Sequence, residues 1–194
     1  MSKAVIFDLN GVFLQSESLS TRFERAFGVK EKDFWPIFKE ILIQVRQPQA
    51  EKVYELLVPY FQQWNVEISE TEFYNFWFSG ESLDREMVLI LQELKKIAWQ
   101  VFILSNNLKE RSLYYRATMS ELKLFDKVYF SWETGYIKPD KRAFNLILQE
   151  NNLIPENCFY FDDSESNVKV GNSLKIKSYL YESPAQVRKI LLDN

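Results

Sequence analysis

The chain has 194 residues with an ordinary globular composition, 46% hydrophobic and 26% charged. This length predicts one substantial domain with room for an insertion, and it is too short for two full-sized domains. The formal net charge is −3, so we do not expect a surface field that attracts nucleic acid or an acidic membrane.

Two residue types that are absent or scarce restrict the chemistry further. The chain has no histidine and a single cysteine, Cys158. This excludes histidine-based catalytic triads, imidazole metal sites, disulfide frameworks and zinc sites made of several thiolates. Any bound metal therefore needs oxygen ligands, which favours magnesium, calcium or manganese.

The apolar runs are too short and too often interrupted by charge to cross a membrane. The first apolar run meets an aspartate almost at once, so it is also too short for a signal peptide. We therefore expect a soluble, cytoplasmic protein that binds neither membrane nor nucleic acid. The sequence does not indicate an oligomeric state.

Five short apolar runs predict buried β-strands, at residues 4–7, 101–104, 128–130, 158–161 and, more weakly, 178–181. Apolar residues at helical spacing lie between them, at 87–94 and 144–148. Ser183 and Pro184 read as the N-cap and first position of a closing helix that runs to residue 192. Strands that alternate with helices predict an α/β fold with a parallel sheet and right-handed crossovers.

Residues 15–84 differ, because they carry helical patterns and almost no strand pattern. Apolar residues recur at helical spacing over 34–45 and 53–64, although Pro59 is expected to kink or split the second helix. Ser69 and Glu72 form a capping box that opens a third helix, and Gly80 is expected to end it. The many aromatic residues are typical of a helical-bundle core. The alternative is that a few of them line the entrance to a substrate-binding site.

Polar side chains stand where each of the first four predicted strands ends. In chain order they are Asp8 and Asn10, then Ser105, Asn106 and Asn107, then Lys138, then Asp162 and Asp163. Singly, most of them have ordinary explanations as turn formers, helix caps or surface lysines. Adjacent carboxylates at a buried strand end are less ordinary, because they repel unless a cation or a proton separates them. In parallel sheets these ends share one edge, where ligands bind.

Such an edge suits phosphoryl transfer. A divalent cation held by Asp8 and by Asp162 or Asp163 would offset the charge of a bound phosphate. Ser105 and Lys138 are candidates to hold the remaining phosphate oxygens. Asp8 is then placed to attack phosphorus as a carboxylate nucleophile, giving an aspartyl-phosphate.

Four segments carry a family resemblance: residues 8–12 (DLNGV), 104–106 (LSN), 138–139 (KP) and 162–163 (DD). In this order and spacing the chain resembles the haloacid dehalogenase-like (HAD) hydrolase superfamily, and in appearance it is similar to its bacterial sugar 1-phosphate phosphatases. The resemblance implies a Rossmann-like three-layer core formed by residues 1–14 and 85–194. It also implies that residues 15–84 form an inserted helical-bundle cap, which closes over the substrate.

The resemblance implies a role for each motif residue. Asp8 is the nucleophile and also binds Mg²⁺, with the Asn10 backbone carbonyl and the side chain of Asp162 or Asp163 as further ligands. The implied phosphate-binding residues are Ser105, Asn106 and Lys138, and Lys138 also assists catalysis.

Asn10 departs from the family pattern, because most family phosphatases have aspartate there as general acid and base. An amide does not exchange a proton near neutral pH, and such catalysis is worth about 10²–10⁴-fold. Asn10 therefore argues against an efficient phosphatase. The sugar 1-phosphate relatives also lack an aspartate at this place, so its loss need not abolish activity.

The leading hypothesis is a Mg²⁺-dependent phosphatase that acts on a small phosphorylated metabolite such as a sugar phosphate. A dehalogenase is the nearest enzymatic alternative, and the pair Asp162 and Asp163 argues against it, since displacement at carbon needs no cation for a phosphate. The alternative of another class is a catalytically degenerate member that binds a phosphorylated ligand or a protein partner.

Overall fold

The computed structural model describes residues 3–193 and contains a five-stranded parallel sheet in the order β5-β4-β1-β6-β7. The strands are β1 (Ala4–Phe7), β4 (Gln100–Ser105), β5 (Lys127–Phe130), β6 (Cys158–Asp162) and β7 (Lys177–Leu180). All five predicted strands are confirmed, and the weakest is displaced by one residue. The central β1 is buried along its whole length, as expected for an apolar strand covered on both faces.

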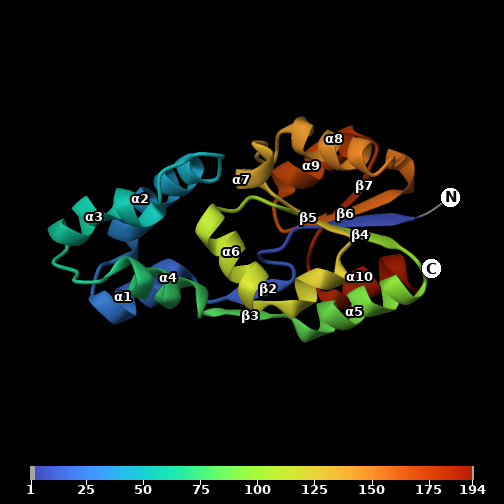
Figure 1. The fold of residues 1–194 in the computed structure, drawn as a ribbon. Helices are drawn as coiled ribbons and strands as arrows, with labels where there is room; N and C mark the ends of the chain where they lie inside the picture. The colour runs from blue at the N-terminus through green and yellow to red at the C-terminus, as the bar shows by residue number, and fades with distance from the viewer. Residues whose placement is uncertain (1–2, 194) are drawn as a thin grey trace.

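Helices cover both faces of this sheet (Figure 1). On one face lie α8 (Lys141–Glu150) and α9 (Glu165–Ser173), and on the other α5 (Arg85–Lys96), α6 (Lys109–Thr118) and α10 (Pro184–Leu191). Successive β1 side chains alternate between the two cores: Val5 and Phe7 pack with α5 and α10, and Ala4 and Ile6 pack with α8. The predicted three-layer Rossmann-like α/β core is therefore confirmed.

Between residues 17 and 80 the chain forms four helices that lie to one side of the sheet (Figure 1). They are α1 (Leu19–Phe27), α2 (Glu31–Val45), α3 (Val53–Gln63) and α4 (Glu70–Phe78). Their buried aromatic and aliphatic side chains form a separate core, which also packs on Leu108 at the start of α6. The Ser69 capping box opens α4 as predicted, and Ser183 caps α10.

Pro59 does not divide its helix, because α3 runs unbroken from Val53 to Gln63. Proline removes one backbone donor, which leaves the carbonyl of Glu55 without its usual partner. Both residues lie on the exposed side of α3, so water can satisfy that carbonyl. The expected split was therefore wrong, and the alternative of a kink at Pro59 stays a prediction.

Two short strands, β2 (Leu14–Ser16) and β3 (Glu81–Leu83), were not predicted. They pair antiparallel, with Leu14 opposite Leu83, at the two points where the chain leaves and re-enters the sheet domain. The remaining short elements are α7 (Ser131–Thr134), η1 (Ser120–Leu124) and η2 (Pro155–Asn157). None of the helices between residues 3 and 193 combines the length and apolar character needed to cross a bilayer.

Candidate active site

The candidate site lies beyond the carboxyl ends of the three central strands. Phe7 at the end of β1 pairs with Ile103 of β4 on one side and with Phe161 of β6 on the other. This register brings Asp8 beside Asp162, and the amide of Asp8 donates to the Phe161 carbonyl at 2.9 Å. The strand order reverses between β1 and β6, because β4 and β5 lie on one side of β1 while β6 and β7 lie on the other, and ligands bind at such a point in these sheets.

A cavity of about 320 Å³ opens at this edge. Its lining includes six of the predicted site residues, namely Asp8, Asn10, Ser105, Asn106, Lys138 and Asp163, together with Arg46 and Arg111. Asp162 does not line the cavity and is fully buried next to it. The structure therefore brings the predicted site residues together from four separate loops.

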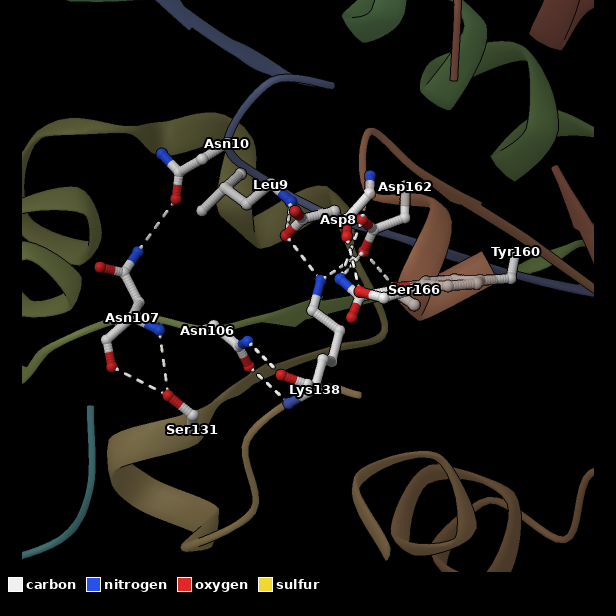
Figure 2. A network of polar contacts seen from close by, with 12 residues as sticks. Asp8, Leu9, Asn10, Asn106, Asn107, Ser131, Lys138, Tyr160, Asp162 and Ser166 are labelled. Atoms are coloured by element: carbon white, nitrogen blue, oxygen red, sulfur yellow. Dashed lines mark hydrogen bonds and ion pairs between the residues drawn. The ribbon is translucent and has the colours of Figure 1, made fainter. Parts of the chain in front are cut away.

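The Lys138 ammonium lies between two carboxylates (Figure 2). Its Nζ is 3.0 Å from Asp8 Oδ1 and 2.6 Å from Asp162 Oδ2. Burial alone would lower the pKa of Lys138, but the two carboxylates outweigh it and raise that pKa. Lys138 is thus a fixed positive charge at the floor of the cavity and not a solvated surface lysine.

Four groups donate hydrogen bonds to the Asp162 carboxylate. Lys138 Nζ and the Tyr160 hydroxyl reach Oδ2, the Ser164 amide reaches Oδ1 at 2.8 Å, and Asn167 Nδ2 lies 3.0 Å from both oxygens. Burial opposes its ionisation, but Lys138 and these hydrogen bonds lower the pKa of Asp162. Both oxygens of this carboxylate are therefore occupied by protein donors.

Asp163, by contrast, is exposed and reaches into the cavity. Partial desolvation of its carboxylate by the cavity wall and the neighbouring Asp162 carboxylate raise the pKa of Asp163. Gly11, with a φ of 84°, faces it so closely that an added Cβ would overlap the Asp163 carboxylate. One carboxylate oxygen from each of Asp8, Asp162 and Asp163 lies within 4.8 Å of the others, so this cluster of oxygen donors can hold a cation such as Mg²⁺.

Asp8 is buried, and burial raises its pKa to about 6, against the lowering effect of Lys138. Its Oδ1 accepts from the Leu9 amide at 2.7 Å and faces Lys138. The described contacts of this carboxylate are thus concentrated on one oxygen. The second oxygen is the one available for attack on a bound group.

Ser105 and Asn106 behave differently from each other. The Ser105 hydroxyl is buried and has no hydrogen-bond partner within residues 3–193, so it is a free donor at the cavity. The Asn106 side chain instead forms two hydrogen bonds with the backbone of Lys138, donating to its carbonyl and accepting from its amide, both at 2.8 Å (Figure 2). Asn106 therefore fixes the loop that carries Lys138.

Asn10 is held from two sides. Its Nδ2 donates to the Tyr115 hydroxyl at 2.9 Å, and its Oδ1 accepts from Asn107 Nδ2 at 3.3 Å. The Tyr115 hydroxyl in turn donates to Glu81 Oε2 at 2.5 Å. Neither Tyr115 nor Glu81 was predicted as a site residue, because neither belongs to a recognisable motif.

Two arginines that the sequence analysis also missed line the cavity. Arg111 on α6 pairs with Glu81, whose side chain is 2% exposed, and its guanidinium lies over the rings of Trp77 and Tyr115. Arg46 follows directly after α2, and burial and the nearby Arg111 lower its pKa. Its position at a helix end gave no signal, since a charged residue there is usually a solvated cap.

Several solved structures share this fold. A HAD family enzyme from Bacteroides thetaiotaomicron superimposes with a TM-score of 0.81 at 21% identity, covering 97% of this chain and 98% of that chain. A second structure of that enzyme, in complex with magnesium and inorganic phosphate, gives a TM-score of 0.77 at 20% identity over 94% of this chain and 95% of that one.

Curated relatives include the D-ribitol-5-phosphate phosphatase of Bacteroides thetaiotaomicron, 30% identical over 66 residues. That match covers 34% of this chain and only 32% of the relative. The phosphorylated carbohydrates phosphatase of Thermotoga maritima is 23% identical over 90% of this chain and 82% of its own length. The haloacid dehalogenase-like hydrolase family matches residues 2–174, and the chain belongs to this family.

Proposed function

We propose that the protein is a Mg²⁺-dependent phosphatase that hydrolyses a small phosphorylated metabolite through an aspartyl-phosphate on Asp8. The observation that carries this proposal is the joint placement of a buried carboxylate, a buried ammonium and an unpartnered buried hydroxyl on one cavity. The two phosphatase relatives act on phosphorylated carbohydrates by name, which supports a phosphorylated carbohydrate or carbohydrate derivative as substrate.

In this proposal Asp8, Asp163 and the backbone carbonyl of Asn10 hold the Mg²⁺. Asp162 is less suited to direct contact, because four protein donors already occupy its two oxygens. Its role is to hold Lys138 and, through the close packing at this edge, to add negative charge near the cation. When bound, Mg²⁺ neutralises phosphate charge and orients the phosphoryl group.

The free oxygen of Asp8 then attacks phosphorus, and the bond from phosphorus to the ester oxygen breaks. The leaving oxygen keeps the bonding electrons and takes a proton from water. A second water hydrolyses the acyl phosphate, which returns the Asp8 carboxylate and releases inorganic phosphate. Ser105 and Lys138 hold the phosphoryl oxygens during both steps, with Asn106 positioning Lys138.

We further propose that residues 15–84 act as a cap over a core formed by residues 1–14 and 85–194. The loop after α2 approaches the core, since Pro48 lies 3.7 Å from where a side chain on Gly135 would begin. Figure 1 shows this loop beside α7. The cap thereby brings Arg46 to the catalytic cavity.

One observation favours a second candidate, a degenerate member that binds phosphorylated ligands without turnover. Asn10 offers an amide where an acid is useful, and its hydrogen bonds direct Nδ2 away toward Tyr115. Such a protein would retain the phosphate site and the cation site while lacking efficient proton transfer.

A colorimetric phosphate-release assay separates the two candidates. The substrates are sugar, sugar-alcohol, nucleotide and acyl phosphates together with p-nitrophenyl phosphate, each with Mg²⁺ and with EDTA. We expect turnover that requires Mg²⁺ and disappears in Asp8→Asn, a variant that keeps the volume of the side chain. Asp33→Asn, an exposed change on α2, is the matched control. Binding of phosphate ligands without release from any substrate would identify the degenerate member instead.

A further inference from the structure

Arg46 is a cation without a partner. No hydrogen bond or ion pair links its guanidinium to any other residue within 3–193, although the side chain lines the catalytic cavity. The other two cations of the cavity are paired, Lys138 with Asp8 and Asp162, and Arg111 with Glu81. A partly buried guanidinium gives up much of its hydration, and that loss is compensated when an anion binds.

The surroundings of Arg46 make an unpaired positive charge at this position still less favourable. Burial lowers the pKa of Arg46 and the like charge of Arg111 lowers it further, while the Asp8 carboxylate acts in the opposite direction. Arg111 also has a buried Nε without a partner among the described residues. Arg46 has five planar donors free for a ligand, and Arg111, although paired with Glu81, adds a second guanidinium at the same cavity, so the pair forms a receptor for a carboxylate or phosphate group.

The place of this pair relative to Asp8 indicates which part of the substrate it contacts. Ser105 and Lys138 approach Asp8 from the strand ends and serve the transferred phosphoryl group in the proposed function. Arg111 is connected to Asn10 through Glu81 and Tyr115, and Arg46 comes from the cap. The arginine pair therefore lies toward Asn10 and the cap, in the part of the cavity that the proposed mechanism leaves for the leaving portion of the substrate.

We propose that the substrate carries a second anionic group, a carboxylate or a second phosphate, on its leaving portion, and that Arg46 binds it with support from Arg111. This inference rests on the proposed phosphoryl site at Asp8. It narrows the substrate class to doubly acidic metabolites, such as phosphorylated sugar acids, phosphorylated hydroxy acids or bisphosphates. A neutral sugar phosphate would leave Arg46 without its anion.

Binding of non-hydrolysable phosphonates tests this independently of turnover. In the presence of Mg²⁺, 3-phosphonopropionate and ethane-1,2-diphosphonate are compared with propylphosphonate by calorimetry. Propylphosphonate has the same phosphonate but a methyl group in place of the second anion. We expect at least one doubly acidic ligand to bind about 10- to 100-fold more tightly, as charge-assisted hydrogen bonds predict. The one that gains more distinguishes carboxylate from phosphate.

Arg46→Gln should remove this preference, and Arg46→Lys should restore part of it, because a lysine keeps the charge and loses the planar fork. Arg25→Gln is the matched control, since Arg25 is an exposed cap arginine paired with Glu17. Circular dichroism spectra and melting curves establish that each variant is folded.

Equal binding of acidic and neutral ligands by the natural protein would overturn the inference while leaving the phosphoryl site in place. An equal loss of affinity for all three ligands in Arg46→Gln would also overturn it, because Arg46 would then contact the transferred group. If none of the phosphonates binds in the presence of Mg²⁺, the proposed function and this inference fall together.

Discussion

The Asn10 side chain is oriented by Tyr115, through a hydrogen bond of 2.9 Å from Nδ2 to the tyrosine hydroxyl. A hydroxyl has one proton, and Tyr115 donates that proton to the Glu81 carboxylate. The hydroxyl therefore accepts from Asn10, and this assigns the amide so that its oxygen faces Asn107. A residue at the mouth of the cavity is thus fixed by a tyrosine of α6 and a glutamate of β3.

Tyr115→Phe tests whether this orientation supports turnover. The change frees the Asn10 amide to rotate and should lower kcat by about 10-fold or more, because small displacements next to a reacting centre are costly. Tyr129→Phe is a matched control, since Tyr129 donates to Glu150 and accepts from Asn151 far from the cavity. Both variants should lose about 1 kcal/mol of stability, but only the first should lose turnover. Equal kcat values for the two variants would contradict the role of Tyr115.

Local sequence patterns predicted the strands and their polar ends, because both depend on neighbours in the chain. Asp8 follows a buried apolar run, and Asp162 and Asp163 follow another, so their meeting at one sheet edge was predictable. The different environments of Asp162 and Asp163 were not predictable, since they depend on which carboxylate is buried against Lys138 and Tyr160. That difference arises from tertiary packing.

Tyr115 and Arg46 were also outside the reach of sequence patterns. Tyr115 lies in a helix of mostly polar residues, where one buried hydroxyl has no local signature. Arg46 reaches the cavity only because the loop after α2 folds back toward Gly135 and the strand ends. The short strands β2 and β3 were missed for a similar reason, as three residues each are too few for an alternation pattern.

Lys138→Met should destabilise the protein in a pH-dependent way when Mg²⁺ is absent. Removing the ammonium leaves Asp8 and Asp162 as buried charges without their cation, which costs about 3–5 kcal/mol near pH 8. The pKa of Asp8 is already raised to about 6 in the folded protein, against about 4 in the unfolded chain. Protonation therefore favours the folded state, and the stability that it provides is lost as the pH rises from about 4 through 6.

Without Lys138 both carboxyl groups lose the cation that lowers their pKa values, so this loss with rising pH becomes larger. Urea denaturation in EDTA at pH 5 and pH 8 measures the free energy of unfolding of both proteins. We expect Lys138→Met to lose less stability, relative to the natural protein, at pH 5 than at pH 8. Lys127→Met is the control, because Lys127 forms an exposed pair with Glu150 and its loss should cost at most about 1 kcal/mol at either pH. A deficit for Lys138→Met that does not change with pH would show that the buried carboxylates are not its source.

Gly11→Ala should weaken Mg²⁺ binding through Asp163. The new methyl group would overlap the Asp163 carboxylate and displace it. Gly28→Ala is a close control, since Gly28 has a similar φ of 75° but nothing within 4 Å of an added Cβ. Both changes carry the cost of about 1 kcal/mol for a side chain at positive φ. Only Gly11→Ala should also lose Mg²⁺ affinity, by about the 10–100-fold typical of disturbed metal sites.

The rise in melting temperature with Mg²⁺ concentration measures that affinity, because a ligand of the folded state stabilises it by mass action. Asp163→Asn should reduce the rise at least as strongly, while Glu165→Gln, an exposed change two residues further on, should leave it intact. An identical Mg²⁺ response in Gly11→Ala and Gly28→Ala would remove Asp163 from the proposed ligands.

Asn10→Asp should change how the rate depends on the leaving group. With an amide at this position the leaving oxygen departs largely as an anion, so the natural protein should favour phosphates of acidic alcohols and phenols. The new carboxylate would face the Tyr115 hydroxyl, whose single proton already serves Glu81. Two carboxylates around one hydroxyl share a proton, which raises the pKa of the new group and suits it to act as an acid.

A series of substituted phenyl and alkyl phosphates gives the dependence of kcat/KM on leaving-group pKa. We expect a steep fall with rising pKa in the natural protein and a flatter one in Asn10→Asp, with alkyl phosphates gaining about 10²–10⁴-fold. Asn151→Asp is the control, because Asn151 also donates to a tyrosine hydroxyl but lies away from the cavity. The same slope in the natural protein and in Asn10→Asp would mean that another group or an ordered water supplies the proton, and the amide at position 10 would then not limit the choice of substrate.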